Sequence, residues 1–135
     1  QMLTKINKLV GDLNGKTVAI LGLAFKPETD DMREAPSIGI IRGLVDGGAK
    51  VRAYDPVART EANKILPDIE YADDEYAAVT RADALIFVTE WNQFRALDMT
   101  RIRDLMNKPR IADLRNICDP ADMRELGFEY VGVGR

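Results

Sequence analysis

The stretch KTVAILGLAFKPETDDMR, residues 16–33, decides the fold that the rest of the sequence suggests. Its apolar, β-prone run Thr17–Leu21 predicts a buried parallel strand. Gly22 ends the run and permits a tight turn, and a long polar loop follows. The segment that begins at Pro36 is strongly periodic and predicts a helix. A strand, a glycine turn and a helix are how α/β proteins present backbone N–H groups to phosphates.

This loop departs from the fingerprint of dinucleotide-binding folds. After Gly22 the sequence reads LAFKP, so the G-x-G-x-x-G pattern is absent. The loop carries two cations instead, Lys26 and Arg33, on either side of the acidic pair Asp30-Asp31. Two adjacent carboxylates in a loop are weak evidence for Mg²⁺, and a chain with no histidine and one cysteine argues against zinc, so no metal site is predicted.

Length and composition set the bounds of the interpretation. The chain has 135 residues, which is one domain, and its hydrophobic fraction of 46% is ordinary for a globular protein. The net charge of −3 argues against nucleic acid as a partner. No apolar run is long enough to span a membrane. The single cysteine, Cys118, fits a reducing compartment and hence a cytoplasmic location. With no histidine to activate it, Cys118 is interpreted as structural, and no catalytic residue is predicted.

Strands and helices alternate along the rest of the chain. Further strands are predicted at 50–54, 69–71, 84–88, 110–113 and 128–131. Helices are predicted between them, at 58–66, 74–81, 99–106 and 120–125 and from Pro36 to about Gly47, whereas 89–92 is expected to be a loop. The helix after the long loop should bury Ile38, Ile41, Leu44 and Val45. This rhythm predicts a Rossmann-like, doubly wound parallel sheet of about six strands in the order 3-2-1-4-5-6, with helices on both faces.

Residues 1–15 have apolar positions at helical spacing. A short amphipathic helix leading straight into a first strand suggests a domain cut from a longer chain, and the alternative is a plain N-terminal helix. We therefore divide the chain at residue 13. Residues 1–13 are expected to be the end of a helix of the longer parent chain, and 14–135 the domain itself.

Ligands of such sheets bind beyond the carboxyl ends of the strands, where the strand order reverses. Here this point is the crevice between strands one and four. The loops around it bring together three cations, Lys26, Arg33 and Arg115, and offer Phe25 and Trp91 as aromatic surface. Guanidinium and ammonium groups both suit phosphate oxygens.

Each of these candidates has a plainer interpretation. The two loop cations can pair with neighbouring acids, Arg115 can cap a helix, and Trp91 can simply pack. Asp55, which ends the second strand, resembles the ribose-binding acid of a dinucleotide fold, but a turn residue before Pro56 is the favoured interpretation.

Four motifs resemble a known family. They are GLAFKPETDDMREAPS (22–37), VRAYDP (51–56), TEWNQFRALD (89–98) and ADLRNICDP (112–120). The chain resembles, over essentially its whole length, the C-terminal, UDP-binding domain of bacterial UDP-glucose 6-dehydrogenases, within the UDP-glucose/GDP-mannose dehydrogenase family.

The resemblance implies a role in oxidising UDP-glucose to UDP-glucuronate with two NAD⁺. It implies that NAD is bound mainly by a missing N-terminal domain, that the catalytic cysteine lies upstream, that residues 1–13 end a long central helix, and that the full-length enzyme is a homodimer. Phe25, Lys26 and Arg115 match substrate-binding positions, and Arg33 matches an arginine that reaches NAD. The fragment alone is expected to be inactive.

Two alternatives stay open at this point. One is a dehydrogenase domain for another nucleotide sugar, GDP-mannose or UDP-N-acetylmannosamine. The other is a stand-alone α/β binding or signalling module, receiver-like, that uses Asp30-Asp31 and Arg115. The second needs a phosphoacceptor after the third strand, where the chain offers Asp73-Asp74.

Overall fold

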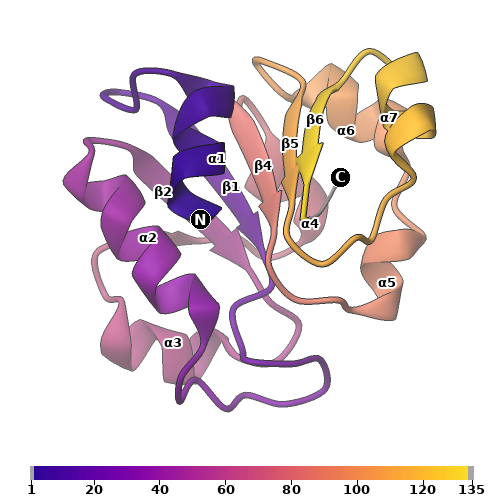
Figure 1. Cartoon of the computed structure of the whole chain (residues 1–135). Coiled ribbons are helices and arrows are strands. Elements are labelled where there is room, and N and C mark those ends of the chain that lie inside the picture. Colours follow the sequence, from indigo (N-terminus) through magenta and orange to yellow (C-terminus); the bar gives the residue numbers. More distant parts are fainter. Residues whose placement is uncertain (1, 134–135) are drawn as a thin grey trace.

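The computed structural model describes residues 2–133, and its strands form one parallel sheet (Figure 1). The strand order is β3-β2-β1-β4-β5-β6, which confirms the predicted doubly wound topology. The order reverses between β1 and β4, which pair directly. The strands are β1 (Thr17–Leu21), β2 (Lys50–Tyr54), β3 (Glu70–Tyr71), β4 (Ala84–Phe87), β5 (Arg110–Asp113) and β6 (Glu129–Gly132).

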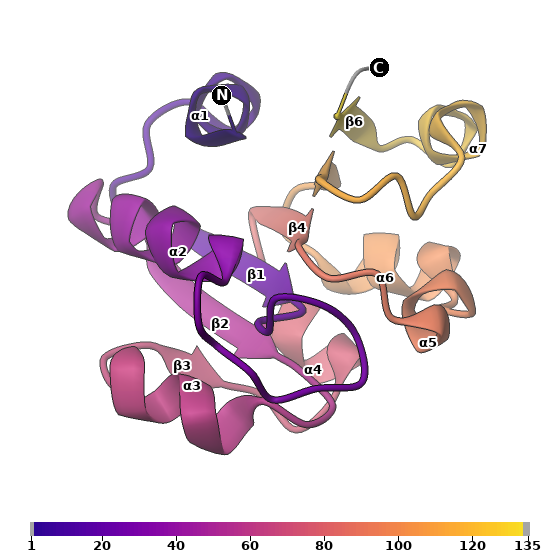
Figure 2. The ribbon, with the colours of Figure 1, turned by 60° about the horizontal axis from the view of Figure 1, so that its bottom comes forward.

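Helices cover both faces of the sheet (Figure 2). One face carries α1 (Met2–Val10), α2 (Pro36–Asp46) and α3 (Arg59–Ile65), and the other carries α4 (Glu75–Val79), α5 (Asn92–Arg95), α6 (Met99–Leu105) and α7 (Pro120–Glu125). Alternation along β1 shows why two cores form. Val18 and Ile20 point into the first core, and Ala19 and Leu21 point into the second. No helix in the described part of the chain is long and apolar enough to cross a lipid bilayer.

Helix α1 is an integral part of the first face. It lies beside α2 and contacts β5 and β6. Its Ile6 is fully buried, and the Lys5 Nζ atom donates a hydrogen bond to the Gly132 carbonyl at 3.0 Å. The boundary after residue 13 and the origin of this helix in a longer chain remain predictions.

Two details differ from the sequence-based expectation. The buried face of α2 is Ser37, Ile40, Ile41 and Leu44, whereas Val45 is 42% exposed. Val45 follows Leu44 by one residue, which turns it by about 100° around the helix axis and toward solvent. The short helix α5 begins at Asn92, so the loop predicted at 89–92 ends one residue earlier than expected. Four residues are too few to show helical periodicity, and Trp91 gives no side-chain cap.

Candidate functional site

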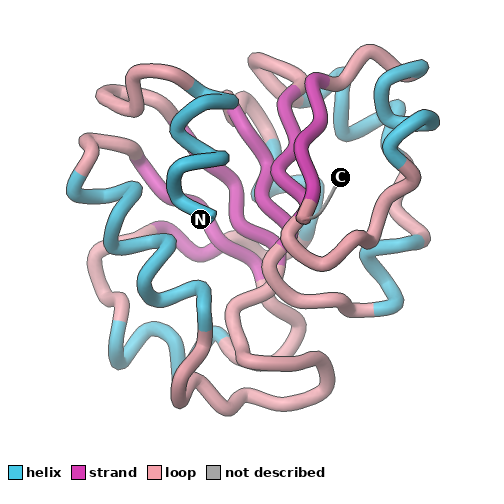
Figure 3. Tube along the Cα trace, in the orientation of Figure 1, coloured by secondary structure: helices cyan, strands magenta, loops and turns pink. Residues whose placement is uncertain are grey.

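The loops that follow the strands gather at one end of the molecule (Figure 3). At the point where the strand order reverses, the loop after β1 lies against the residues that follow β4 and β5, because side chains from both hydrogen bond to it. Among the predicted candidates, Arg115 is bonded to the Phe25 carbonyl at the carboxyl edge of the sheet, where a parallel α/β fold binds its ligands. Lys26 and Arg33 follow Phe25 in the same loop.

The loop after β1 has two parts. We call Gly22–Phe25 the stem and residues 26–34 the tip. In the stem, the N–H groups of Leu23 and Ala24 both donate to the Asp55 Oδ2 atom, at 2.8 and 3.3 Å. The N–H group of Phe25 donates to the Asp31 carbonyl at 3.2 Å, which closes the tip onto the stem.

The three carbonyls of residues 23–25 are bound by side chains. In chain order, they accept from Ser37 Oγ at 2.6 Å, Thr89 Oγ1 at 2.9 Å and Arg115 Nη2 at 3.3 Å. These side chains come from α2 and from the loops after β4 and β5. All six backbone polar groups of residues 23–25 are thus satisfied, and elements on both sides of the strand reversal fix the stem.

Asp55 is a buried junction at the end of β2. The residue is 5% exposed. Its second carboxylate oxygen, Oδ1, accepts hydrogen bonds from the N–H groups of Val57 and Ala58, at 2.9 and 2.8 Å. The carboxylate therefore receives four backbone donors, two from the stem and two from its own turn. This confirms Asp55 as a turn residue, and its bonds to the stem were not predicted from the sequence.

Gly22 allows the stem to approach the loop after β4. Its φ is +95°, and an added Cβ atom would lie 2.5 Å from the Thr89 Cβ atom and 2.6 Å from the Thr89 nitrogen. Glycine is required here on both counts, backbone conformation and space. Thr89 is fully buried, which is consistent with this close contact.

Arg115 joins the two halves of the sheet. Its Nε atom donates to the Val88 carbonyl at 2.9 Å, while Nη2 reaches the Phe25 carbonyl. The Arg115 backbone is held in turn by Asp113, which is fully buried and whose two oxygens accept from the N–H groups of residues 115, 117 and 118 and from the Tyr130 hydroxyl. Arg115 is half-buried and does not cap a helix; it clamps the stem.

The tip is charged and largely exposed, except for Met32, which is buried in the first core. The Arg33 side chain is 88% exposed and forms a fork-like pair with Asp31, with Nε–Oδ1 at 3.0 Å and Nη2–Oδ2 at 2.9 Å. The Arg33 hydrogen bonds lower the pKa of the Asp31 carboxyl to about 2, with a smaller contribution from the charge of Lys26. Phe25 is 48% exposed and lines, with Arg33, Asp31 and Glu34, a hollow of about 360 Å³.

The local ion pair that the sequence left open for Arg33 is therefore present, formed with Asp31. A contact of Arg33 with a cofactor stays a prediction. Lys26 is exposed next to the stem. In the described part of the chain, no group of three or more acidic or cysteine side chains has a metal-binding arrangement.

Trp91 and Tyr54 support the edge from the second core. Trp91 packs against that core with its indole nitrogen buried, which agrees with the interpretation of Trp91 as a packing residue.

Burial, and then the charge of Glu75, raise the pKa of the Tyr54 hydroxyl. Gln93 of α5 donates to Glu75 at 2.7 Å and so ties α5 to α4. Phe25 is thus the exposed aromatic surface at this edge.

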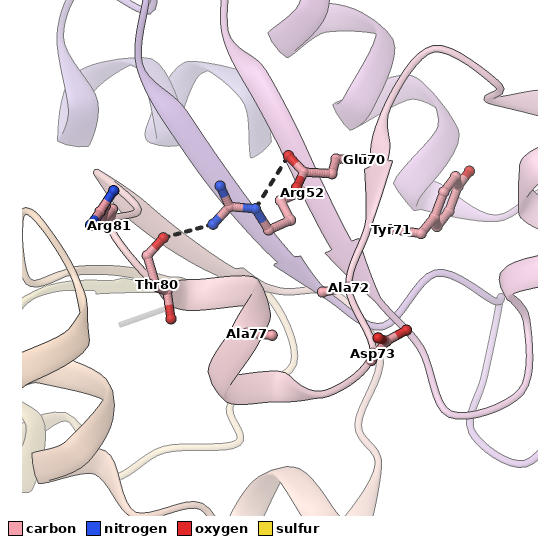
Figure 4. Close-up of a pocket in the computed structure, with 8 residues that line it drawn as sticks. All are labelled: Arg52, Glu70, Tyr71, Ala72, Asp73, Ala77, Thr80 and Arg81. Atoms are coloured by element: carbon pink, nitrogen blue, oxygen red, sulfur yellow. Dashed lines mark hydrogen bonds and ion pairs between the residues drawn. The ribbon is translucent and has the colours of Figure 1, made fainter.

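A second hollow, of about 470 Å³, lies along the edge strand β3 (Figure 4). Its Arg52 is already engaged, since the Nη1 atom donates to the Thr80 carbonyl at 2.6 Å and the Nε atom lies 3.4 Å from a Glu70 carboxylate oxygen. Glu70 and Asp73 also line this hollow beside Arg52 and Arg81, so its charges do not single it out as a phosphate site.

Comparison with known proteins shows the family of the chain. Residues 19–120 match the model of the UDP-glucose/GDP-mannose dehydrogenase family, UDP binding domain. A UDP-glucose 6-dehydrogenase of Pseudomonas aeruginosa is 49% identical over 131 residues, and one of Rhizobium meliloti is 46% identical over 125 residues. Both matches cover 93% of this chain, but the chain spans only 29% of the length of either relative.

Solved structures of nucleotide-sugar dehydrogenases superpose on the chain over nearly its whole length. A UDP-glucose dehydrogenase from Pyrobaculum islandicum superposes with a TM-score of 0.81 at 33% identity, covering 98% of this chain and 28% of that one. An NDP-N-acetyl-D-galactosaminuronic acid dehydrogenase from Methanosarcina mazei superposes with a TM-score of 0.82 at 29% identity, again over 98% of this chain and 28% of that one.

Proposed function

From the premise that this chain belongs to the UDP-glucose/GDP-mannose dehydrogenase family, as its UDP-binding domain, we propose that it binds the nucleotide part of UDP-glucose at the carboxyl edge of the sheet. The observation that carries the proposal is the convergence of Phe25, Lys26 and Arg115, with Arg115 bonded to the Phe25 carbonyl. The proposed contacts are Lys26 and Arg115 to the diphosphate and Phe25 to an apolar part of the ligand.

The proposal extends to the full-length protein. In this proposal, the full-length protein is a dehydrogenase that oxidises UDP-glucose to UDP-glucuronate with two NAD⁺. NAD is held mainly by a domain outside this chain, Arg33 contacts the cofactor across the cleft between domains, and the enzyme acts as a cytoplasmic homodimer. The guanidinium of Arg33 supports this role because it is exposed and can leave Asp31 for another anion. The chain alone is proposed to be inactive.

The alternatives are less well supported. The relatives described above at more than 45% identity are both UDP-glucose 6-dehydrogenases, which favours UDP-glucose over another nucleotide sugar. A receiver-like role needs an available acceptor aspartate after β3. Asp74 instead caps α4 by accepting from the Ala77 N–H group, and Asp73 pairs with Arg59 at 2.9 Å.

Titration calorimetry tests the site. UDP and UDP-glucose should bind the protein more tightly than GDP-mannose. Lys26→Ala should weaken UDP binding about tenfold or more, because one charge-assisted contact is lost. Lys108→Ala is the matched control, since Lys108 is exposed and precedes β5, at the opposite edge of the sheet. Equal losses from the two variants, or tighter binding of GDP-mannose, would contradict the proposal.

A further inference from the structure

In a dinucleotide-binding fold, the turn after the first strand leaves its backbone N–H groups open toward the pyrophosphate. The corresponding turn here is the stem. The N–H groups of Leu23 and Ala24 point not at an open site but at the Asp55 carboxylate, 2.8 and 3.3 Å away. A protein carboxylate therefore takes up two N–H donors that a dinucleotide-binding turn would offer to a phosphate oxygen.

The surroundings of Asp55 make this occupation complete. The carboxylate is buried and its two oxygens accept from four backbone N–H groups, those of residues 23, 24, 57 and 58. No lysine or arginine forms an ion pair with it among the residues that the structure describes. Its negative charge is stabilised by backbone dipoles alone, as a bound anion is in a phosphate-binding loop.

We propose that Asp55 is a specificity-determining residue that acts as a built-in anion. It takes up the backbone donors after β1, so this domain cannot hold a pyrophosphate against that turn. A nucleotide diphosphate must then be bound by side-chain cations beyond the stem, Lys26 and Arg115. The second half of this inference rests on the proposed nucleotide site, and the first half does not.

Replacing the carboxylate by a small neutral group should leave a hole lined by four donors that an external anion can fill. The test is thermal unfolding of Asp55→Ala in sodium formate and in sodium chloride at equal ionic strength, with inorganic phosphate as a second probe. Formate at about five times its dissociation constant should raise the unfolding midpoint of the variant by about 3–5 °C above the value in chloride.

Two controls separate this effect from a general effect of the salt. The unsubstituted protein should show no such difference, because its own carboxylate fills the hole. Asp73→Ala should show none either, because Asp73 is exposed and bonds to a single side chain, that of Arg59. Equal midpoints of Asp55→Ala in formate and chloride, or the same shift in Asp73→Ala, would overturn the proposal.

Asp55→Ala can also fail to fold in chloride. Refolding from urea is then compared in the two salts by circular dichroism. Recovery in formate alone supports the built-in anion, and recovery in neither salt contradicts it.

A double-mutant cycle tests the consequence for specificity. Lys26→Ala should weaken UDP binding about tenfold or more in the natural background but less than about threefold in the Asp55→Ala background, where freed backbone donors share the phosphate. An equal loss in both backgrounds would overturn the specificity role. If UDP does not bind the unsubstituted protein, the proposed function fails, and the formate experiment still decides the role of Asp55.

Discussion

Residues 22–25 and 26–34 follow one another in the same loop, but their polar groups are satisfied in different ways. The stem is bonded by Asp55, Ser37, Thr89 and Arg115, which come from four separate places in the chain. The polar groups of the tip bond within the loop, chiefly in the exposed pair of Arg33 with Asp31, while Met32 packs into the first core.

The difference indicates how one loop can be both fixed and functional. A buried backbone that is bonded on every side resists displacement, whereas an exposed ion pair contributes little to stability and can exchange partners. Substitutions that remove the buried bonds of the stem should therefore act on folding, and substitutions of exposed side chains in the tip on binding. The predictions below test this division, from the largest expected effect to the smallest.

Gly22→Ala should produce the largest effect, a loss of about 2–5 kcal/mol in the free energy of unfolding. The new methyl group meets the Thr89 backbone, which cannot move aside, and the residue must keep a positive φ. Urea denaturation of the chain measures the change. Gly39→Ala is the control, because nothing lies within 4 Å of a Cβ atom built there. A Gly22→Ala protein as stable as Gly39→Ala would remove the case for a rigid stem.

Lys26 and Arg33 should show separate binding roles in the full-length enzyme. Lys26→Ala should mainly weaken the use of UDP-glucose, and Arg33→Ala should mainly raise the KM for NAD⁺, each by roughly ten- to a hundredfold in kcat/KM. Steady-state kinetics with each ligand varied separately, and a thermal unfolding curve for each variant, provide the measurement. Equal effects on both KM values would refute the division of roles, and a large loss of stability would refute the description of the tip.

Thr89→Val should cost about 1–2 kcal/mol, because the Ala24 carbonyl loses its buried donor while the side chain keeps its size. Ser37→Ala should have a similar effect through the Leu23 carbonyl. Thr100→Val, on the exposed side of α6, serves as the matched control. Urea denaturation should give both stem variants a clearly lower free energy of unfolding than the control. Equal free energies of unfolding in all three variants would mean that the carbonyl bonds of the stem do not contribute to stability.

The smallest effect concerns the pH dependence of the ion pair between Asp31 and Arg33 in the tip. Because the pKa of Asp31 is lowered to about 2 in the folded chain, its ion pair contributes fully above the ordinary value of 3.8. The contribution is lost as the pH falls through about 2. An NMR titration of the Asp31 carboxyl should give a midpoint near 2, and Arg33→Ala should return it toward the ordinary value. An unchanged midpoint in Arg33→Ala would assign the shift to something other than this pair.

The sequence predicted the parts of this structure that depend on local patterns. The apolar run of β1, the glycine after it and the alternation of strands with helices define a doubly wound sheet, and that topology places Phe25, Lys26 and Arg115 at one edge. Those arguments need only the order of the elements. They do not need atomic positions.

The bonds of the stem could not be predicted in the same way. Asp55 lies 32 residues from Leu23 in the chain, and Arg115 lies 90 residues from Phe25. Whether such pairs meet depends on the register of β1 with its neighbours and on side-chain rotamers, which no local pattern records. One signal was available for Asp55, since an acid at the end of the second strand stands beside the loop after the first in this topology.

Helix α1 has a consequence for the synthesis of the protein. It is made before the strands that it packs against, because it contacts β5 and β6, and its Lys5 bonds to a carbonyl 127 residues further along the chain. Its fully buried Ile6 therefore has no complete partner surface until the last strand has left the ribosome. Helix α1 and β6 can join only after β6 has been made, so we expect this domain to complete its fold late, in one cooperative step.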